Sequence, residues 1–141
     1  MPAHNFSYRF DSIPVDFTDQ EDIYKHNSPL NNTDDLESQF NKMLFAYKNL
    51  LNERADLAVN AFPEVNGVAE LSVYHALKRK LFSKAIKKHC FSLCMTRYEG
   101  DKLYLYFYDT QDIEKVKLFF VDWIREGKLP DLSQWQRTFI A

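Results

Sequence analysis

The chain has 141 residues, which fits one domain, and its 45% hydrophobic and 16% aromatic residues suffice for a packed core. Its 3 glycines disfavour a loop-rich, phosphate-cradling enzyme, and no apolar run approaches the ~18 residues of a membrane span. Two cysteines are too few for a disulfide scaffold and no targeting segment is visible, so we expect a cytoplasmic protein.

The net charge of −2 conceals an asymmetry between the two halves. Residues 1–70 hold 5 Lys and Arg against 12 Asp and Glu, whereas residues 71–141 hold 13 against 8. The net charge of a sequence and its distribution indicate how a protein associates with partners, but they do not indicate its fold. The acidic half can neutralise the basic half within one domain, or the basic segment can face an acidic partner.

Residues 1–33 show little helical signal and are expected to form an extended acidic arm. Phe6, Tyr8 and Phe10 alternate with polar residues, which allows a short strand. Pro14 and Pro29 interrupt the pattern, and a cluster of turn residues follows. We expect the arm to lead into a single domain over residues 34–141.

A long helix is predicted from residue 34 to Pro63. Thr33 or Asn32 can cap it, and its apolar residues recur with 4-3 spacing. This stripe comprises Leu36, Phe40, Met43, Tyr47, Leu50, Leu57 and Ala61. Such a stripe forms one side of an antiparallel helix pair or the seam of a coiled-coil homodimer.

A second helix is predicted from Val68 to about Lys88, after a turn at Asn66-Gly67. Its buried stripe would comprise Leu71, Tyr74, Leu77, Leu81 and Ala85. Because the connection is short, the two helices would be antiparallel neighbours.

The pattern then changes to a period of two. The segments "CFSLCMTRY" and "KLYLYFYD" flank "EGD", which predicts a β-hairpin with Gly100 in its turn. Phe91, Leu93 and Met95 share one face of the first strand. The second strand divides into a face of Leu103, Leu105 and Phe107 and a face of Tyr104, Tyr106 and Tyr108. Since a lone hairpin is marginal, its edge should be joined by the N-terminal strand or by another chain.

A helix follows the hairpin, capped by Asp109 or Thr110 and ended by Gly127. Its predicted core residues are Ile113, Val116, Phe120, Trp123 and Ile124. Beyond Pro130, a short helical tail would place Leu132, Trp135, Phe139 and Ile140 on one face. The predicted fold class is therefore α+β, with a long antiparallel helix pair, a β-hairpin open to an N-terminal strand, a C-terminal helix and a short helical tail.

Two features could bind a ligand. Six Lys and Arg and no acidic residue occur between His75 and His89, and Lys80, Lys84 and Lys87 would line one side of the second helix. The three tyrosines of the hairpin, flanked by Arg97 and Lys102, could stack on bases or contact a protein. Alternatively, the lysines form a solvated helix face and the tyrosines form the back of a sheet.

Catalytic and metal-binding signatures are missing. The chain lacks the Walker, dinucleotide-binding, His-Glu-x-x-His and Gly-x-Ser-x-Gly motifs. On a strand, Cys90 and Cys94 would stand near 13 Å apart at ~3.3 Å per residue, too far to share one zinc ion. The acidic residues 11–22 lack a calcium-binding loop. We therefore predict no cofactor, no metal and no catalytic residue.

The sequence thus favours a small cytoplasmic binding, adaptor or inhibitor-type protein that acts by contact with another protein. The alternative is a nucleic-acid-binding protein, and an enzyme without a recognisable motif is a third class. A homodimer could form through the first helix or through the hairpin edge. The candidate binding residues are Lys80, Lys84, Lys87, Arg97, Tyr104, Tyr106 and Tyr108.

Overall fold

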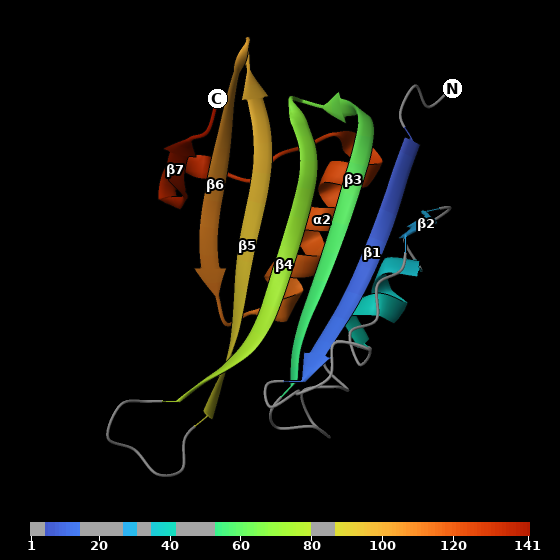
Figure 1. Ribbon diagram of the computed structural model, residues 1–141, viewed down its shortest axis with the longest axis vertical. Coiled ribbons are helices and arrows are strands. Elements are labelled where there is room, and N and C mark those ends of the chain that lie inside the picture. Colours follow the sequence, from blue (N-terminus) through green and yellow to red (C-terminus); the bar gives the residue numbers. More distant parts are fainter. Residues whose placement is uncertain (1–4, 15–26, 31–34, 42–52, 80–86) are drawn as a thin grey trace.

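A computed structural model describes residues 5–14, 27–30, 35–41, 53–79 and 87–141 of the chain (Figure 1). These residues build one seven-stranded antiparallel sheet in the order β2-β1-β3-β4-β5-β6-β7. The strands are β1 (Asn5–Pro14), β2 (Asn27–Pro29), β3 (Glu53–Val65), β4 (Val68–Arg79), β5 (Lys87–Glu99), β6 (Lys102–Thr110) and β7 (Gln136–Phe139). From β3 to β6 each strand pairs with its successor in the chain.

Helices cover one face of the sheet and lie behind it in Figure 1. They are α2 (Ile113–Glu126) and a helical segment at residues 35–41. The two contact each other through Phe40 and Phe120, whose ring centroids are 5.4 Å apart. Trp123 of α2 packs edge-on against Phe6 of β1, also at 5.4 Å. The core therefore lies between this helix layer and the sheet.

The predicted helix pair is wrong, because residues 53–65 and 68–79 are strands β3 and β4. Leu57 and Ala61 are four residues apart, a spacing that fits a helical stripe and a strand face equally well. Val59, between them, has no exposed surface and shares their face. The apolar residues of β3 therefore follow the two-residue period of a strand and not the period of a helix. A homodimer seam along a helix from residue 34 to Pro63 is excluded with it.

The turn at Asn66-Gly67 is where the sequence predicted it, but it joins two strands. Val65 pairs with Val68, and the two turn residues have φ angles of 51° and 80°. Positive φ at both central positions is typical of the type I′ turn, whose twist matches that of a β-hairpin. An Asn-Gly pair between two segments of alternating apolar residues is a strong signal for a β-hairpin. The prediction of two helices did not take it into account.

The predicted hairpin and C-terminal helix are confirmed. β5 and β6 pair antiparallel around Gly100, which has a φ angle of 66°. Phe91, Leu93 and Met95 are all buried on one face. α2 ends at Gly127 as predicted, but its N-cap is Asp112 rather than Asp109 or Thr110, because the Asp112 carboxylate accepts bonds from the amides of the first turn.

The predicted helical tail is wrong. After the short 3-10 helix η2 (Leu132–Gln134), the chain enters strand β7. β7 pairs with β6 from Tyr104 to Phe107, so this part of the hairpin edge is occupied within the chain. The N-terminal strand β1 also joins the sheet, but it pairs with β2 and β3 rather than with the hairpin. No helix in the described ranges is long and apolar enough to cross a membrane.

Candidate binding face

The tyrosines of β6 face the helix layer. In the register of β5 and β6, Tyr108 lies opposite Leu93 and Tyr106 lies opposite Met95, and both partners are core residues. Only 6% of Tyr106 is exposed, and Tyr104 and Tyr108 pack partly buried against the core. The tyrosine ring at position 106 is therefore not displayed to a ligand in this structure.

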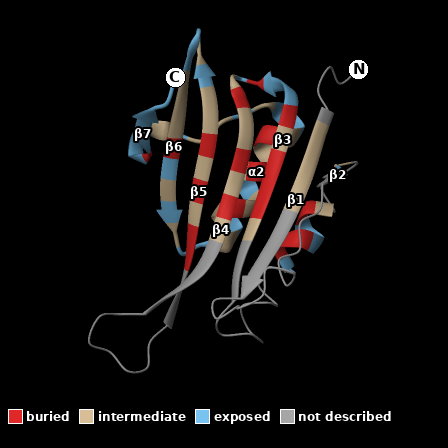
Figure 2. Ribbon diagram, viewed as in Figure 1, coloured by how far each residue is buried: buried red, intermediate tan, exposed pale blue. Residues whose placement is uncertain are grey.

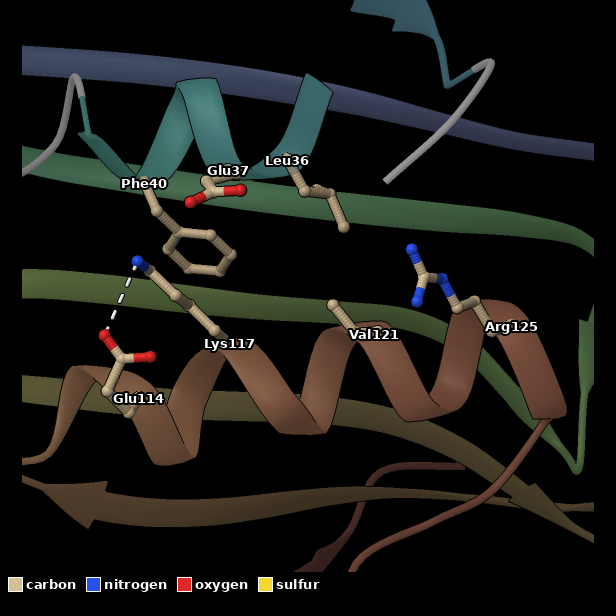
Figure 3. Close-up of a pocket in the computed structure, with 7 residues that line it drawn as sticks. All are labelled: Leu36, Glu37, Phe40, Glu114, Lys117, Val121 and Arg125. Carbon is tan, nitrogen blue, oxygen red and sulfur yellow. Dashed lines mark ion pairs between the residues drawn. The ribbon is translucent and has the colours of Figure 1, made fainter. Parts of the chain in front are cut away.

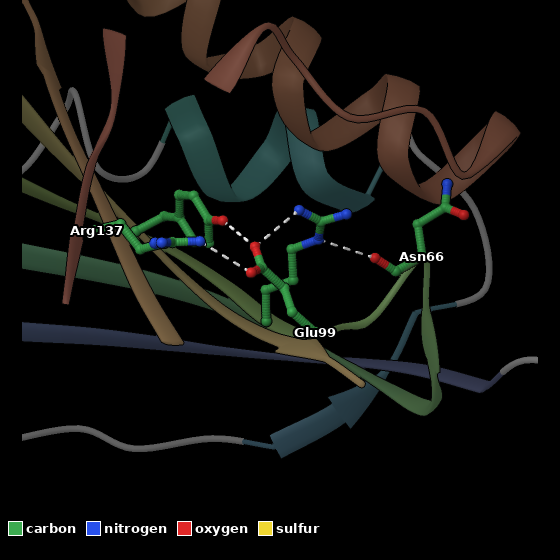
Figure 4. A network of polar contacts seen from close by, with 5 residues as sticks. Asn66, Glu99 and Arg137 are labelled. Atoms are coloured by element: carbon green, nitrogen blue, oxygen red, sulfur yellow. Dashed lines mark hydrogen bonds and ion pairs between the residues drawn. The ribbon is translucent and has the colours of Figure 1, made fainter. Parts of the chain in front are cut away.

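A network of polar contacts centres on Glu99, at the end of β5 (Figure 4). One oxygen of its carboxylate accepts hydrogen bonds from the Tyr106 hydroxyl and, at 3.4 Å, from Arg97 Nη1. The other accepts from Arg137 Nη1 at 2.9 Å. Arg97 Nε also donates to the backbone carbonyl of Asn66 at 3.2 Å. Glu99 thereby joins the β3–β4 turn, β6 and β7.

Arg137 fixes β7 to the tyrosine face by a second contact. Its guanidinium lies 4.3 Å from the ring centroid of Tyr104, a cation–π distance, and Tyr104 packs edge-on against Phe139. Hydrogen bonding to Tyr106 is the main cause that raises the pKa of Arg137, and the charge of Glu99 adds to the rise. The arginine thus keeps its charge, and the network holds the C-terminal strand in place.

Tyr108 lies in an aromatic cluster with Phe119 of α2 and Trp135. Its ring stacks on Trp135 at 5.3 Å, and Phe119 contacts both rings. Lys115 Nζ donates to the Tyr108 hydroxyl at 2.7 Å. The contacts of Tyr104, Tyr106 and Tyr108 are therefore structural ones, between the sheet, α2 and the C-terminal segment.

The structure describes only part of the predicted cationic set. Lys80 and Lys84 lie outside the described residues, and Lys87 is the first residue of β5. The helix on which all three would have aligned is not formed, because β4 runs to Arg79. Arg97 belongs to the Glu99 network, so it shares a site with Tyr106.

The other face of the sheet carries the leucine and phenylalanine residues of β6. Leu105 lies opposite Thr96, Phe107 opposite Cys94, and Leu103 opposite Tyr98 of β5. Phe107 is 38% exposed and Tyr98 43% exposed, and the leucines are half-buried. We call Tyr98, Leu103, Leu105 and Phe107 the open-face patch. No described element covers it, and Figure 2 shows exposed segments along β6 on this side.

Polar residues surround the open-face patch toward the centre of the sheet. Ser72 and Ser92 lie on this face beside Cys94, and Glu70 lies opposite Thr96. Burial raises the pKa of the Cys94 thiol, and the nearby charge of Glu70 raises it further. Cys94 therefore stays protonated at neutral pH, which disfavours both metal binding and nucleophilic chemistry.

The described residues contain no group of three or more metal-binding side chains. One pocket of about 260 Å³ lies on the opposite side of the molecule, between residues 35–41 and α2 (Figure 3). Its rim carries Glu37, Glu114, Lys117 and Arg125, and Glu114 pairs with Lys117 at 3.7 Å. Leu36 and Phe40 also line it but are only 1% exposed, so they offer a ligand almost no apolar surface.

The alternation in "KLYLYFYD" predicts two faces, but it does not indicate which of them lies against the core. The apolar face of the paired strand, β5, indicates which face of β6 is buried. An antiparallel hairpin with Glu99 opposite Lys102 places Tyr106 beside Met95, on the most apolar face of β5. That register assigns the tyrosines to the core and the leucines and phenylalanine to solvent.

Comparisons of the chain with models of protein families, with curated proteins and with solved structures found no match.

Proposed function

We propose that this protein acts by binding another protein through the open-face patch. One observation carries the proposal: β6 exposes Phe107 and buries its neighbour Tyr106. Exposing a phenylalanine ring to water costs more free energy than exposing a tyrosine, and a buried tyrosine hydroxyl needs a hydrogen-bond partner. Polarity alone therefore favours the reverse arrangement, with the tyrosine exposed and the phenylalanine buried. An exposed phenylalanine amid leucines and a second aromatic residue is typical of the apolar centre of a protein interface.

The test compares two exposed apolar residues on opposite faces. Phe107→Ser removes the aromatic centre of the patch, and Leu118→Ser removes a 58% exposed leucine from α2 as the matched control. The immobilised wild-type protein should capture a partner from lysate of its source cells, and the purified pair is then measured by calorimetry. A central aromatic residue contributes about 2 kcal/mol or more to binding, so Phe107→Ser should weaken the complex roughly 30-fold.

Equal affinity of the wild type, Phe107→Ser and Leu118→Ser would overturn the proposal. So would loss of binding only in Leu118→Ser, which would move the interface to the helix layer. Thermal denaturation of all three proteins serves as the control for folding. Because both residues are exposed, we expect neither substitution to lower the melting temperature appreciably.

A further inference from the structure

β7 lies at the edge of the sheet beside β6, and its four residues are all exposed. The chain is held firmly just before it, because Trp135 is only 8% exposed and its ring stacks on Tyr108 at 5.3 Å. The boundary between the anchored segment and the exposed strand therefore lies between Trp135 and Gln136. Because β7 contributes no buried residue, it can leave β6 without opening the core.

Two side chains attach β7 to the helix-covered face of the sheet. Arg137 forms an ion pair with Glu99 at 2.9 Å (Figure 4), and its guanidinium lies over the ring of Tyr104. Phe139 packs edge-on against the same ring. The Arg137 side chain is 49% exposed, so water and dissolved ions screen the ion pair. These contacts specify which side chains fit on this face, but they hold β7 only weakly.

On the open face, β7 places polar side chains beside apolar ones. Since side chains alternate along a strand, Gln136 and Thr138 lie on the face opposite to Arg137. The register sets Gln136 opposite Phe107, which stays 38% exposed. It sets Thr138 opposite Leu105, another member of the open-face patch. A strand with apolar residues at these two positions would cover the patch better than β7 does.

β6 stays in the sheet when β7 leaves, because each of its nine residues pairs with β5. β7 pairs with β6 from Tyr104 to Phe107, and the amides of Ile140 and Ala141 both donate to the Leu103 carbonyl. Without these partners, the edge of β6 is a template to which another extended segment can add. Any such segment forms similar backbone hydrogen bonds, so its side chains decide whether it replaces β7.

We propose that the protein partner inserts an extended segment in place of β7, as a strand antiparallel to β6. The segment carries an aromatic residue opposite Tyr104 and a cationic residue opposite Tyr106, where charge complementarity with Glu99 selects it. It carries apolar residues opposite Leu105 and Phe107, where they cover the open-face patch. This inference rests on the proposed function, because it gives the partner of the patch a conformation and a side-chain pattern.

The test uses synthetic peptides and the isotope-labelled full chain, so the partner need not be known. The first peptide, Gln-Arg-Thr-Phe-Ile-Ala, copies residues 136–141. The second contains Gln136→Val and Thr138→Val, which supply the apolar residues for the open face. The third adds Arg137→Glu to these two changes. A nuclear magnetic resonance titration measures each affinity from the shifts of the β6 amides.

Two variants of the full chain change the attachment of β7 in opposite directions. Arg137→Glu places a second carboxylate beside Glu99 and should loosen β7. Gln136→Val with Thr138→Val gives β7 the side chains of the second peptide and should tighten it. Lys128→Glu makes a comparable change of charge at an exposed site after α2 and is the control. Thermal denaturation checks that each variant keeps its folded core.

We expect the second peptide to bind the wild type about fivefold more tightly than the first, since it gains two apolar cross-strand pairs. The third should bind more weakly than the second, because its glutamate meets Glu99. The Arg137→Glu chain should bind the second peptide several-fold more tightly than the wild type does, since β7 competes less. The double-valine chain should bind it several-fold more weakly, and Lys128→Glu should match the wild type.

No binding of the second peptide to the Arg137→Glu chain would refute the replacement of β7. Equal binding by the Arg137→Glu and double-valine chains, or shifts confined to amides outside β6, would refute it as well. In each case the proposed function stands if Phe107→Ser still weakens the partner complex. If the peptides bind as expected but Phe107→Ser leaves that complex unchanged, the proposed function fails, and the assignment of the added strand to that partner fails with it.

Discussion

Tyr106 and Phe107 are neighbours in β6, and their polarity alone would assign them the opposite environments. Tyr106 is accommodated in the core because its hydroxyl donates to Glu99, so no buried donor is left unpaired. Phe107 has no such need and lies on the open face. Removing the hydroxyl bond and removing the exposed ring should therefore have distinct effects, the first on stability and the second on binding.

Tyr106→Phe should lower the free energy of unfolding by about 1–2 kcal/mol, the usual cost of losing a buried hydrogen bond to a charged acceptor. The substitution keeps the ring and its packing against the core, so the loss reports the bond to Glu99. Urea denaturation followed by tryptophan fluorescence measures it. Tyr98→Phe, at a 43% exposed position, is the control and should stay within about 0.5 kcal/mol of the wild type. Equal midpoints for all three proteins would contradict this role of the Glu99 network.

At the scale of elements, the two tight turns of the sheet differ in how much they require glycine. Gly67 has a φ angle of 80°, and a Cβ at this position would collide with the backbone carbonyl oxygen of Tyr98. The Gly67 carbonyl also accepts the amide of Tyr98 at 2.7 Å, so the turn cannot move away freely. Gly100 has a φ angle of 66°, but open space surrounds the place where a Cβ would lie.

Gly67→Ala should therefore destabilise the protein by more than about 2 kcal/mol, since backbone strain and a steric collision add. Gly100→Ala should cost about 1 kcal/mol, from the positive φ alone. Chemical denaturation of the two variants under the same conditions gives the comparison. If Gly100→Ala proved the more damaging, the close approach of the β3–β4 turn to β5 would be wrong.

The elements also show why a helix was predicted where strands are found. In β4, Leu71 and Val73 are buried, while Ser72 and Tyr74 lie half-buried on the other face. Reading Leu71, Tyr74 and Leu77 as one stripe mixes the two faces. Both readings satisfy the apolar pattern, and neighbouring strands on both sides supply the backbone hydrogen bonds that select the extended form.

At the scale of the whole molecule, the strands of the sheet differ in how fully they are paired and buried. The centre of β4 pairs on both sides and contributes fully buried residues to the core. β7 is four residues long with all four exposed, and within the described ranges it pairs only with β6.

Native-state hydrogen exchange should reproduce this gradient. The amides at the centre of β3, β4 and β5 should exchange only by global unfolding, whereas those of β7 should exchange much faster, through local opening. Mass spectrometry of peptides after deuterium labelling measures both. Fast exchange in residues 57–61 together with slow exchange in the C-terminal segment would contradict the strand order.

The sequence by itself determined the local features: the turns at Asn66-Gly67 and Gly100, the β5–β6 hairpin, and the helix that ends at Gly127. Each depends on the backbone preferences of a few consecutive residues. Only the tertiary structure decided that residues 53–65 and 68–79 are strands and that the tyrosines of β6 face the core. These outcomes depend on which distant strands pair and in what register, and an apolar pattern compatible with two periods does not fix that pairing.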